Sequence, residues 1–274
     1  MREKCLMVTE GRAPIVGVAF ASALTQAGAC GEVVSLQVAL PYEEEQLYQA
    51  ELDRIRKTMR KSPRLIAAYG GLLVQMQARR PAVEETLHIL ANSSFTPQQG
   101  DNLDLENICL IWDDDDISPP NRIEQTRLAI KAFHPRPVIA GYTAGWFVNA
   151  RTLHGYKLDL SAELRLWGGS LAWNHAAWKK ALRVGSSFWY GDCPGYDRRF
   201  VEATECDEIV DIPAEDEELP IALCHTKNVA SHYQRKGDPM EDKLEAWLAP
   251  EVFAEVKRFQ KFCVDNRIFP PFSD

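Results

Sequence analysis

The sequence predicts an α/β fold in which helices flank a mostly parallel β-sheet. An apolar run at residues 4–11 is followed by helical spacing of apolar residues over 13–28, and then by a second apolar run at 32–40. A strand, a helix and a strand at this spacing form a βαβ unit, whose two strands are parallel. The chain of 274 residues is 46% hydrophobic, which is enough for a sizeable core.

The other elements follow from periodicity and end signals. Residues 42–61 carry acidic side chains at the start and basic ones at the end, the distribution that the dipole of a helix favours. Prolines at the start of 119–133 are typical of the first turn of a helix. The run 65–77 fits a strand or a helix. Segment 168–182 predicts a glycine turn, a short strand and a helix. Further helices are expected at 42–61, 82–94, 119–133, 195–204 and 241–263, and further strands at 105–112, 137–151 and 208–213.

The chain contains no internal repeat and no convincing linker, so we expect one compact domain with a helical C-terminal extension packed on it. The net charge of −8 and a pI near 5.4 argue against a general polyanion-binding surface. The seven cysteines are scattered and form no CxxC pair, which is typical of reduced, buried thiols. With no long apolar window, we expect a soluble cytoplasmic protein without a transmembrane segment.

Four consecutive carboxylates, Asp113 to Asp116, follow the strand predicted at 105–112. Two carboxylates about 4 Å apart repel by roughly 1 kcal/mol in water and by several times that near a protein surface. In an extended chain Asp113 and Asp115 would point to one side and could hold a hard divalent cation. An exposed acidic turn that caps the next helix through Asp116 or Ser118 explains the residues equally well.

Four segments resemble the GT-A glycosyltransferases, particularly those of family two. "IWDDDDISPPNRIE" (111–124) resembles the DxD region, and "CLMVTEGRAPIVGVAFASALTQ" (5–26) resembles the opening strand, turn and helix. "GGSLAWNHAAWKKA" (168–181) is similar to the small-residue strand and helix, and "YGDCPGYDRRF" (190–200) to the later acidic motif. The resemblance implies a GT-A-like, Rossmann-like sheet and transfer of a sugar from a nucleotide sugar, with Mn²⁺ or Mg²⁺.

The same resemblance implies roles for individual residues. Asp113 and Asp115 would be the DxD pair, with Asp113 near the ribose or the metal and Asp115 on the metal. Asp197 would be the general base of an inverting enzyme, with Asp192 as the alternative.

A late histidine of this fold often reaches the metal, which implies His225, with His232 as the alternative. Thr9 and Arg12 would belong to the nucleotide-facing turn, and Lys227 would face the diphosphate. Trp146, Trp167, Trp173 and Trp189 fall in the half that would bind the acceptor.

The chain also departs from the family pattern. The second strand is not followed by the aspartate that contacts the base, so a uridine diphosphate sugar is the default from the family alone. The stretch from that strand to Asp113 is long, so 42–100 would hold an insertion in a glycosyltransferase domain of residues 1–235, followed by the extension 236–274. The acceptor, whether a glycan, metabolite, protein or modified nucleobase, stays open. A metal-dependent nucleotidyltransferase or phosphoesterase and a non-catalytic metal-binding scaffold are the competing hypotheses.

Overall fold

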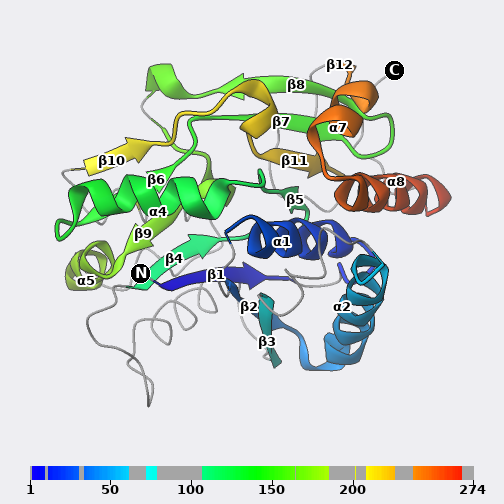
Figure 1. Cartoon of the computed structure of the whole chain (residues 1–274), viewed down its shortest axis with the longest axis horizontal. Helices are drawn as coiled ribbons and strands as arrows, with labels where there is room; N and C mark the ends of the chain where they lie inside the picture. Colours follow the sequence, from blue (N-terminus) through cyan, green and yellow to red (C-terminus); the bar gives the residue numbers. More distant parts are fainter. Residues whose placement is uncertain are drawn as a thin grey trace.

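The computed structural model shows a mixed α/β fold with a mostly parallel central sheet flanked by helices (Figure 1). A seven-stranded sheet has the order β10-β6-β9-β4-β1-β2-β3, and a five-stranded sheet has the order β12-β8-β7-β11-β5. The structure describes residues 2–9, 12–30, 34–61, 72–78, 107–163, 165–184, 201, 208–225 and 237–266.

The seven-stranded sheet confirms the predicted βαβ opening, since β1 and β2 pair in parallel on either side of α1. Every neighbouring pair in this sheet is parallel except those of β9, which runs antiparallel to both β4 and β6. Its strands are β1 (Arg2–Val8), β2 (Val34–Leu40), β3 (Leu72–Ala78), β4 (Asn107–Ile111), β6 (Val138–Gly141), β9 (Ala172–Asn174) and β10 (Glu208–Asp211).

The five-stranded sheet is not predicted from the sequence. Residues 137–151, which the sequence predicts as strand, form two strands. β6 belongs to the first sheet and β7 to the second. In the second sheet β7 and β11 are parallel, and the other pairs are antiparallel. Its strands are β5 (Asp116–Ile117), β7 (Ala144–Asn149), β8 (His154–Asp159), β11 (Ile221–Cys224) and β12 (Asp238–Pro239).

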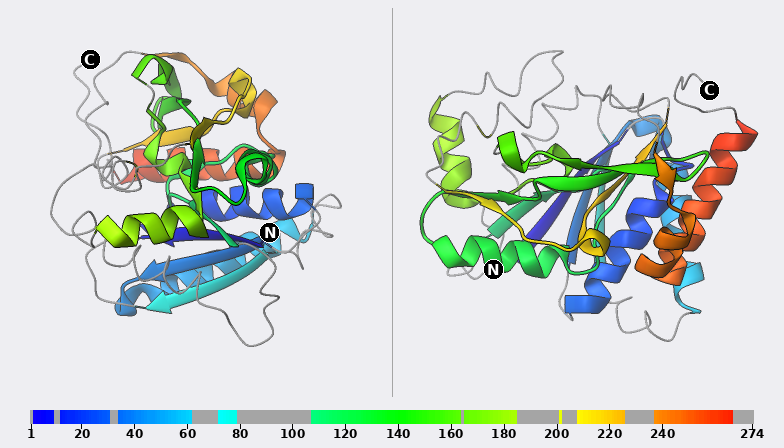
Figure 2. Two further views of the ribbon diagram at one scale, coloured as in Figure 1. Left: turned by 90° about the vertical axis from the view of Figure 1, so that its left-hand side faces the viewer. Right: turned by 90° about the horizontal axis from the view of Figure 1, so that it is seen from above.

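Helix α1 is buried on nearly all sides because it packs against α2, α4 and α8 as well as against strands. Figure 2 shows it stacked above the first sheet, with α8 above it in turn. The helices are α1 (Gly17–Cys30), α2 (Glu45–Met59), α4 (Arg122–Phe133), α5 (His175–Val184), α7 (Glu241–Trp247) and α8 (Pro250–Asp265). Short 3₁₀ turns include η4 (Gly168–Ser170) and η6 (Asp216–Glu218).

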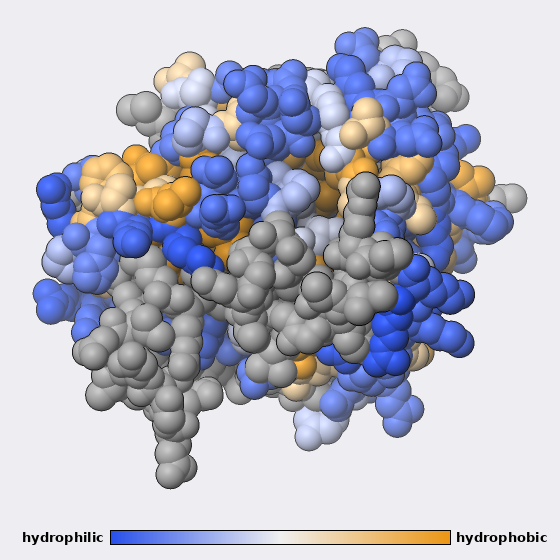
Figure 3. Space-filling model, viewed as in Figure 1, coloured by the Kyte–Doolittle hydropathy of each residue, from blue (hydrophilic) through white to orange (hydrophobic). Residues whose placement is uncertain are grey.

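The remaining sequence predictions have mixed outcomes. The ambiguous run 65–77 contains β3, so its described part is a strand. The helix expected at 82–94 lies outside the described residues, as does that at 195–204 apart from Val201. Within the described ranges no helix combines the length and apolar character that crossing a membrane requires. On the face drawn in Figure 3, hydrophilic side chains cover most of the described surface.

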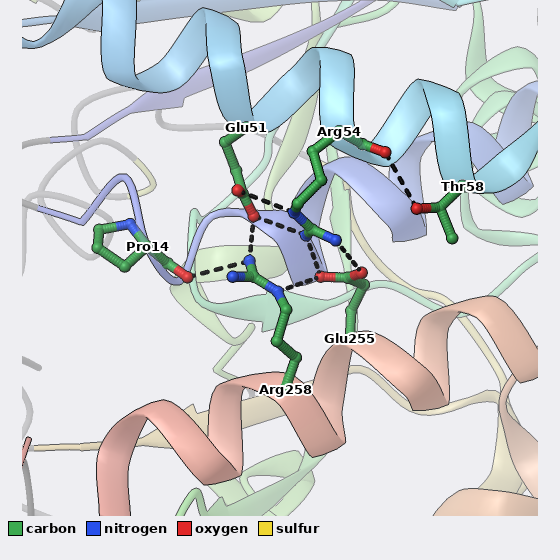
Figure 4. Close-up of polar contacts among 6 residues, drawn as sticks. All are labelled: Pro14, Glu51, Arg54, Thr58, Glu255 and Arg258. Atoms are coloured by element: carbon green, nitrogen blue, oxygen red, sulfur yellow. Dashed lines mark hydrogen bonds and ion pairs between the residues drawn. The ribbon is translucent and has the colours of Figure 1, made fainter. Parts of the chain in front are cut away.

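An ion-pair network joins the C-terminal helix α8 to α2 beside the start of α1 (Figure 4). Arg54 of α2 donates to both carboxylate oxygens of Glu255 on α8, at 2.8 and 2.5 Å, and also to Glu51. Arg258 donates to Glu255 at 2.9 Å, to Glu51 and to the carbonyl of Pro14. These bonds fix α8 against α2 and against the backbone of Pro14.

Candidate functional site

Three strand ends converge at the candidate site. Thr9 and Arg12 follow β1, the acidic residues Asp113 to Asp116 follow β4, and His225 follows β11. In open α/β sheets, ligands bind beyond the carboxyl ends of the strands. β5 begins at Asp116 and pairs with β11 through Asp116 and Ala222, and this pairing places His225 beside the acidic turn.

The acidic residues do not follow the alternation expected of an extended chain. The backbone turns at Asp114 and Asp115, so these neighbouring carboxylates both reach Arg12, whose Nη1 donates to Asp114 Oδ1 at 2.6 Å and to Asp115 Oδ2 at 3.1 Å. Asp113 and Asp116 instead lie together against Gly169, where an added Cβ would collide with Oδ2 of each. The prediction that Asp113 and Asp115 share one side is therefore wrong.

His225 contacts Asp115 directly, across 110 residues of sequence. His225 Nε2 lies 3.0 Å from Asp115 Oδ2, within hydrogen-bond distance, and both residues are buried, with exposed fractions of 0% and 5%. Burial disfavours the charged carboxylate, but this bond and the charge of Arg12 outweigh it and lower the pKa of Asp115. Phe259 of α8 meets the imidazole edge-on, with ring centroids 5.5 Å apart, so the C-terminal helix also contacts the site.

The other three carboxyl groups are poorly compensated. Burial, followed by the charges of Asp115 and Asp114, raises the pKa of Asp113 to about 7. Burial and Asp115 raise the pKa of Asp114 to about 6, against the opposing effect of Arg12. Burial and the charge of Asp113 raise the pKa of Asp116 well above its usual value. A bound cation would relieve this repulsion.

The chemistry of the cluster fits a hard divalent cation, which prefers oxygen ligands. Asp114 is 2% exposed, and its Oδ2 has no hydrogen-bond partner within the described part of the chain. In the same part of the chain, no group of three or more His, Cys, Asp or Glu side chains is arranged to hold a metal ion. The Asp115 carboxylate and the His225 imidazole are nevertheless in contact, and one carboxylate oxygen of Asp114 is unused.

Tyr48 of α2 holds the turn that carries Thr9 and Arg12. Its hydroxyl lies 2.6 Å from Thr9 Oγ1 and accepts a hydrogen bond from the backbone N–H of Arg12 at 3.1 Å. The structure thus brings the two residues expected in a nucleotide-facing turn to the acidic cluster, with the Arg12 guanidinium on the carboxylates. Of the other predicted site residues, Asp192, Asp197 and Lys227 lie outside the described residues, as do His232 and Trp189.

Sequence reasoning missed Arg122, the first residue of α4. It is 2% exposed and lies beneath the acidic turn, with its Cζ 5.1 Å from the centroid of the Trp112 ring. The sequence signal available was an arginine six residues after the last aspartate, at the start of a proline-opened helix. Such an arginine is normally solvent-exposed, so burial could not be predicted.

Comparisons with known proteins give only distant structural similarity. No protein-family model and no curated protein matches the sequence. Staphylococcus aureus TarS residues 1–349 gives a TM-score of 0.47 at 11% identity, covering 81% of this chain and 60% of that one. The chain therefore spans less than two thirds of the TarS chain.

Two further solved structures are similar at the same low level. One is 4-diphosphocytidyl-2C-methyl-D-erythritol synthase from Anaerococcus prevotii, with a TM-score of 0.44, 10% identity and coverage of 77% and 88%. The other is UDP-glucose pyrophosphorylase complexed with UDP-glucose, with a TM-score of 0.40, 9% identity and coverage of 96% and 100%. Likenesses this weak add no argument about activity, so the functional argument depends on the site.

Proposed function

We propose that the protein is a metal-dependent glycosyltransferase that moves a sugar from a nucleotide diphosphate sugar to an acceptor hydroxyl. The observation that carries the proposal is the contact between Asp115 and His225. Arg12 donates a hydrogen bond to the same carboxylate, and the three residues meet at the carboxyl ends of β1, β4 and β11. An oxygen-rich cluster with a histidine at this edge is suited to a cation and a diphosphate together. The four motifs that resemble GT-A enzymes support the same class.

In this proposal Asp115 and His225 would hold Mn²⁺ or Mg²⁺. The motif resemblance assigns Asp113 to the same cation, although its side chain lies with that of Asp116 against Gly169. The cation, when bound, supplies positive charge to the leaving nucleoside diphosphate. Arg12 holds Asp114 and Asp115 in place through its two hydrogen bonds, and Tyr48 fixes the backbone of Arg12.

The role of general base toward the acceptor hydroxyl is assigned to an aspartate of the segment 190–200. Asp197, with Asp192 as the alternative, would accept the proton from the acceptor hydroxyl in an inverting reaction. This assignment depends on the motif resemblance alone. Asp197→Asn with full transfer activity would eliminate Asp197 as the base and leave Asp192.

Metal-dependent donor binding tests the proposal. Calorimetric titration of the full chain with UDP-sugars, and then with sugars of other nucleoside diphosphates, is expected to show binding in the presence of Mn²⁺ and its loss when EDTA removes the metal. Without a cation at Asp115 and His225, the carboxylates of the acidic turn and the diphosphate would repel each other. No metal-dependent binding of any nucleotide sugar would refute the proposal. Binding accompanied by phosphodiester formation or by hydrolysis without sugar transfer would instead favour a nucleotidyltransferase or phosphoesterase.

A further inference from the structure

Arg122 makes three hydrogen bonds around the acidic turn. Its Nη2 donates to the carbonyl of Ile111 at 2.5 Å and to that of Gly169 at 3.1 Å. Its Nη1 donates to Ser118 Oγ at 2.7 Å. Ile111 ends β4 just before the four aspartates, and Ser118 follows β5 just after them. One guanidinium therefore ties together both ends of the acidic turn.

The third partner, Gly169, forms the wall against which Asp113 and Asp116 lie. By holding the Gly169 carbonyl, Arg122 fixes this wall relative to β4. Gly169 contacts both side chains so closely that a Cβ added to it would collide with Oδ2 of Asp113 and of Asp116. Arg122 thus controls the position of the turn and of the surface that confines it.

Arg122 uses its planar guanidinium as a rigid fork, and its three hydrogen bonds go to two backbone carbonyls and a hydroxyl. Its Nε has no hydrogen-bond partner within the described residues, although the group is 2% exposed. A guanidinium buried with one donor unused is costly, so the remaining donors must contribute enough to keep it there. Lysine has one nitrogen and cannot reproduce the planar fork.

We propose that Arg122 is a positioning residue, which sets the geometry of the acidic turn for a divalent cation by binding Ile111, Gly169 and Ser118. The inference rests on the proposed function, because it assumes that the cluster holds a cation. A positioning role and a purely electrostatic role have opposite effects on the affinity for the cation. A buried positive charge that acted only through its field would weaken cation binding. Positioning of the acidic turn by the guanidinium would strengthen it.

Two substitutions of Arg122 separate these roles in a calorimetric titration of the full chain with MnCl₂. Arg122→Lys keeps the charge and loses the fork, whereas Arg122→Met loses both. Positioning predicts that each variant binds Mn²⁺ at least about tenfold more weakly, the lower end of the range for residues that orient metal ligands. Arg136→Met, at an exposed arginine that pairs with Glu208, is the matched control and should keep wild-type affinity.

The other outcomes overturn the inference in distinguishable ways. Tighter Mn²⁺ binding by Arg122→Met with unchanged binding by Arg122→Lys would show a field effect. A lowered thermal midpoint with wild-type Mn²⁺ affinity in the folded variants would show a purely structural role. If Arg122→Met does not fold, the test depends on Arg122→Lys alone. Wild-type affinity for Mn²⁺ in Arg122→Lys would then refute the positioning role. Absence of Mn²⁺ binding in the wild type would refute the proposed function as well.

Discussion

Asp115→Asn is expected to reduce sugar transfer by about 10³-fold and to abolish measurable Mn²⁺ binding. Asp115 is the carboxylate that contacts His225, and its neutral amide would bind a hard cation poorly. A catalytic cation contributes several kcal/mol of transition-state stabilisation, and each 1.36 kcal/mol corresponds to a factor of about ten in rate. Steady-state transfer kinetics and calorimetry with MnCl₂ measure the two effects.

Asparagine preserves the volume of the side chain and an oxygen that can accept from Arg12 or His225. Circular dichroism should therefore show a folded variant. Asp242→Asn, at an exposed aspartate in the first turn of α7, is the control and should behave as wild type. Transfer activity within about threefold of wild type in Asp115→Asn would exclude this residue from the metal site.

Glu255→Gln is expected to lower the free energy of unfolding by about 2 kcal/mol, the second-largest effect. Glu255 is 5% exposed and accepts hydrogen bonds from Arg54 and Arg258, so its neutralisation leaves Glu51 as the one remaining carboxylate that both arginines contact in the network of Figure 4. Removing one partner of a fully buried pair costs about 3–5 kcal/mol, and the value here is smaller because the two arginine side chains are about one third exposed. Urea denaturation measures the change.

The matched control for this second variant is Glu245→Gln, at an exposed glutamate of the neighbouring helix α7. Its unfolding free energy should stay within about 0.5 kcal/mol of wild type, as is usual for surface substitutions. An unchanged unfolding midpoint in Glu255→Gln would mean that the network does not hold α8 against α2.

The central strands of the first sheet, β1, β2 and β4, could be predicted from the sequence because they are parallel and mostly buried. The apolar runs at 4–11, 32–40 and 105–112 correspond to β1, β2 and β4. Local pattern is sufficient for such elements, since each is a continuous apolar run with clear end signals. The same signals predicted α1, α4 and the C-terminal helices.

The second sheet could not be predicted, because its strands are short and their pairing is non-local. β5 has two residues and exists only through its pairing with β11, more than 100 residues later. The strands β6 and β7 are separated by Tyr142 and Thr143 alone, and the sequence does not show that they belong to different sheets.

The site was predicted in composition but not in arrangement. The acidic run alone fits a cation site and an exposed acidic turn equally well, and the family resemblance implies the cation together with His225 and Arg12. The turn at Asp114 and Asp115 is not predicted by strand alternation, because β4 ends at Ile111 and the chain does not stay extended through the four aspartates. The pairing of Arg12 with Asp114 depends on tertiary packing, which a single sequence does not specify.

The central claim is that a divalent cation binds between Asp115 and His225. Anomalous diffraction at the manganese edge, from crystals grown with MnCl₂ and a nucleoside diphosphate, locates the ion directly. We predict one strong peak between the Asp115 carboxylate and His225 Nε2, next to the diphosphate. A peak elsewhere, or a diphosphate bound at this site with no manganese peak, would contradict the claim.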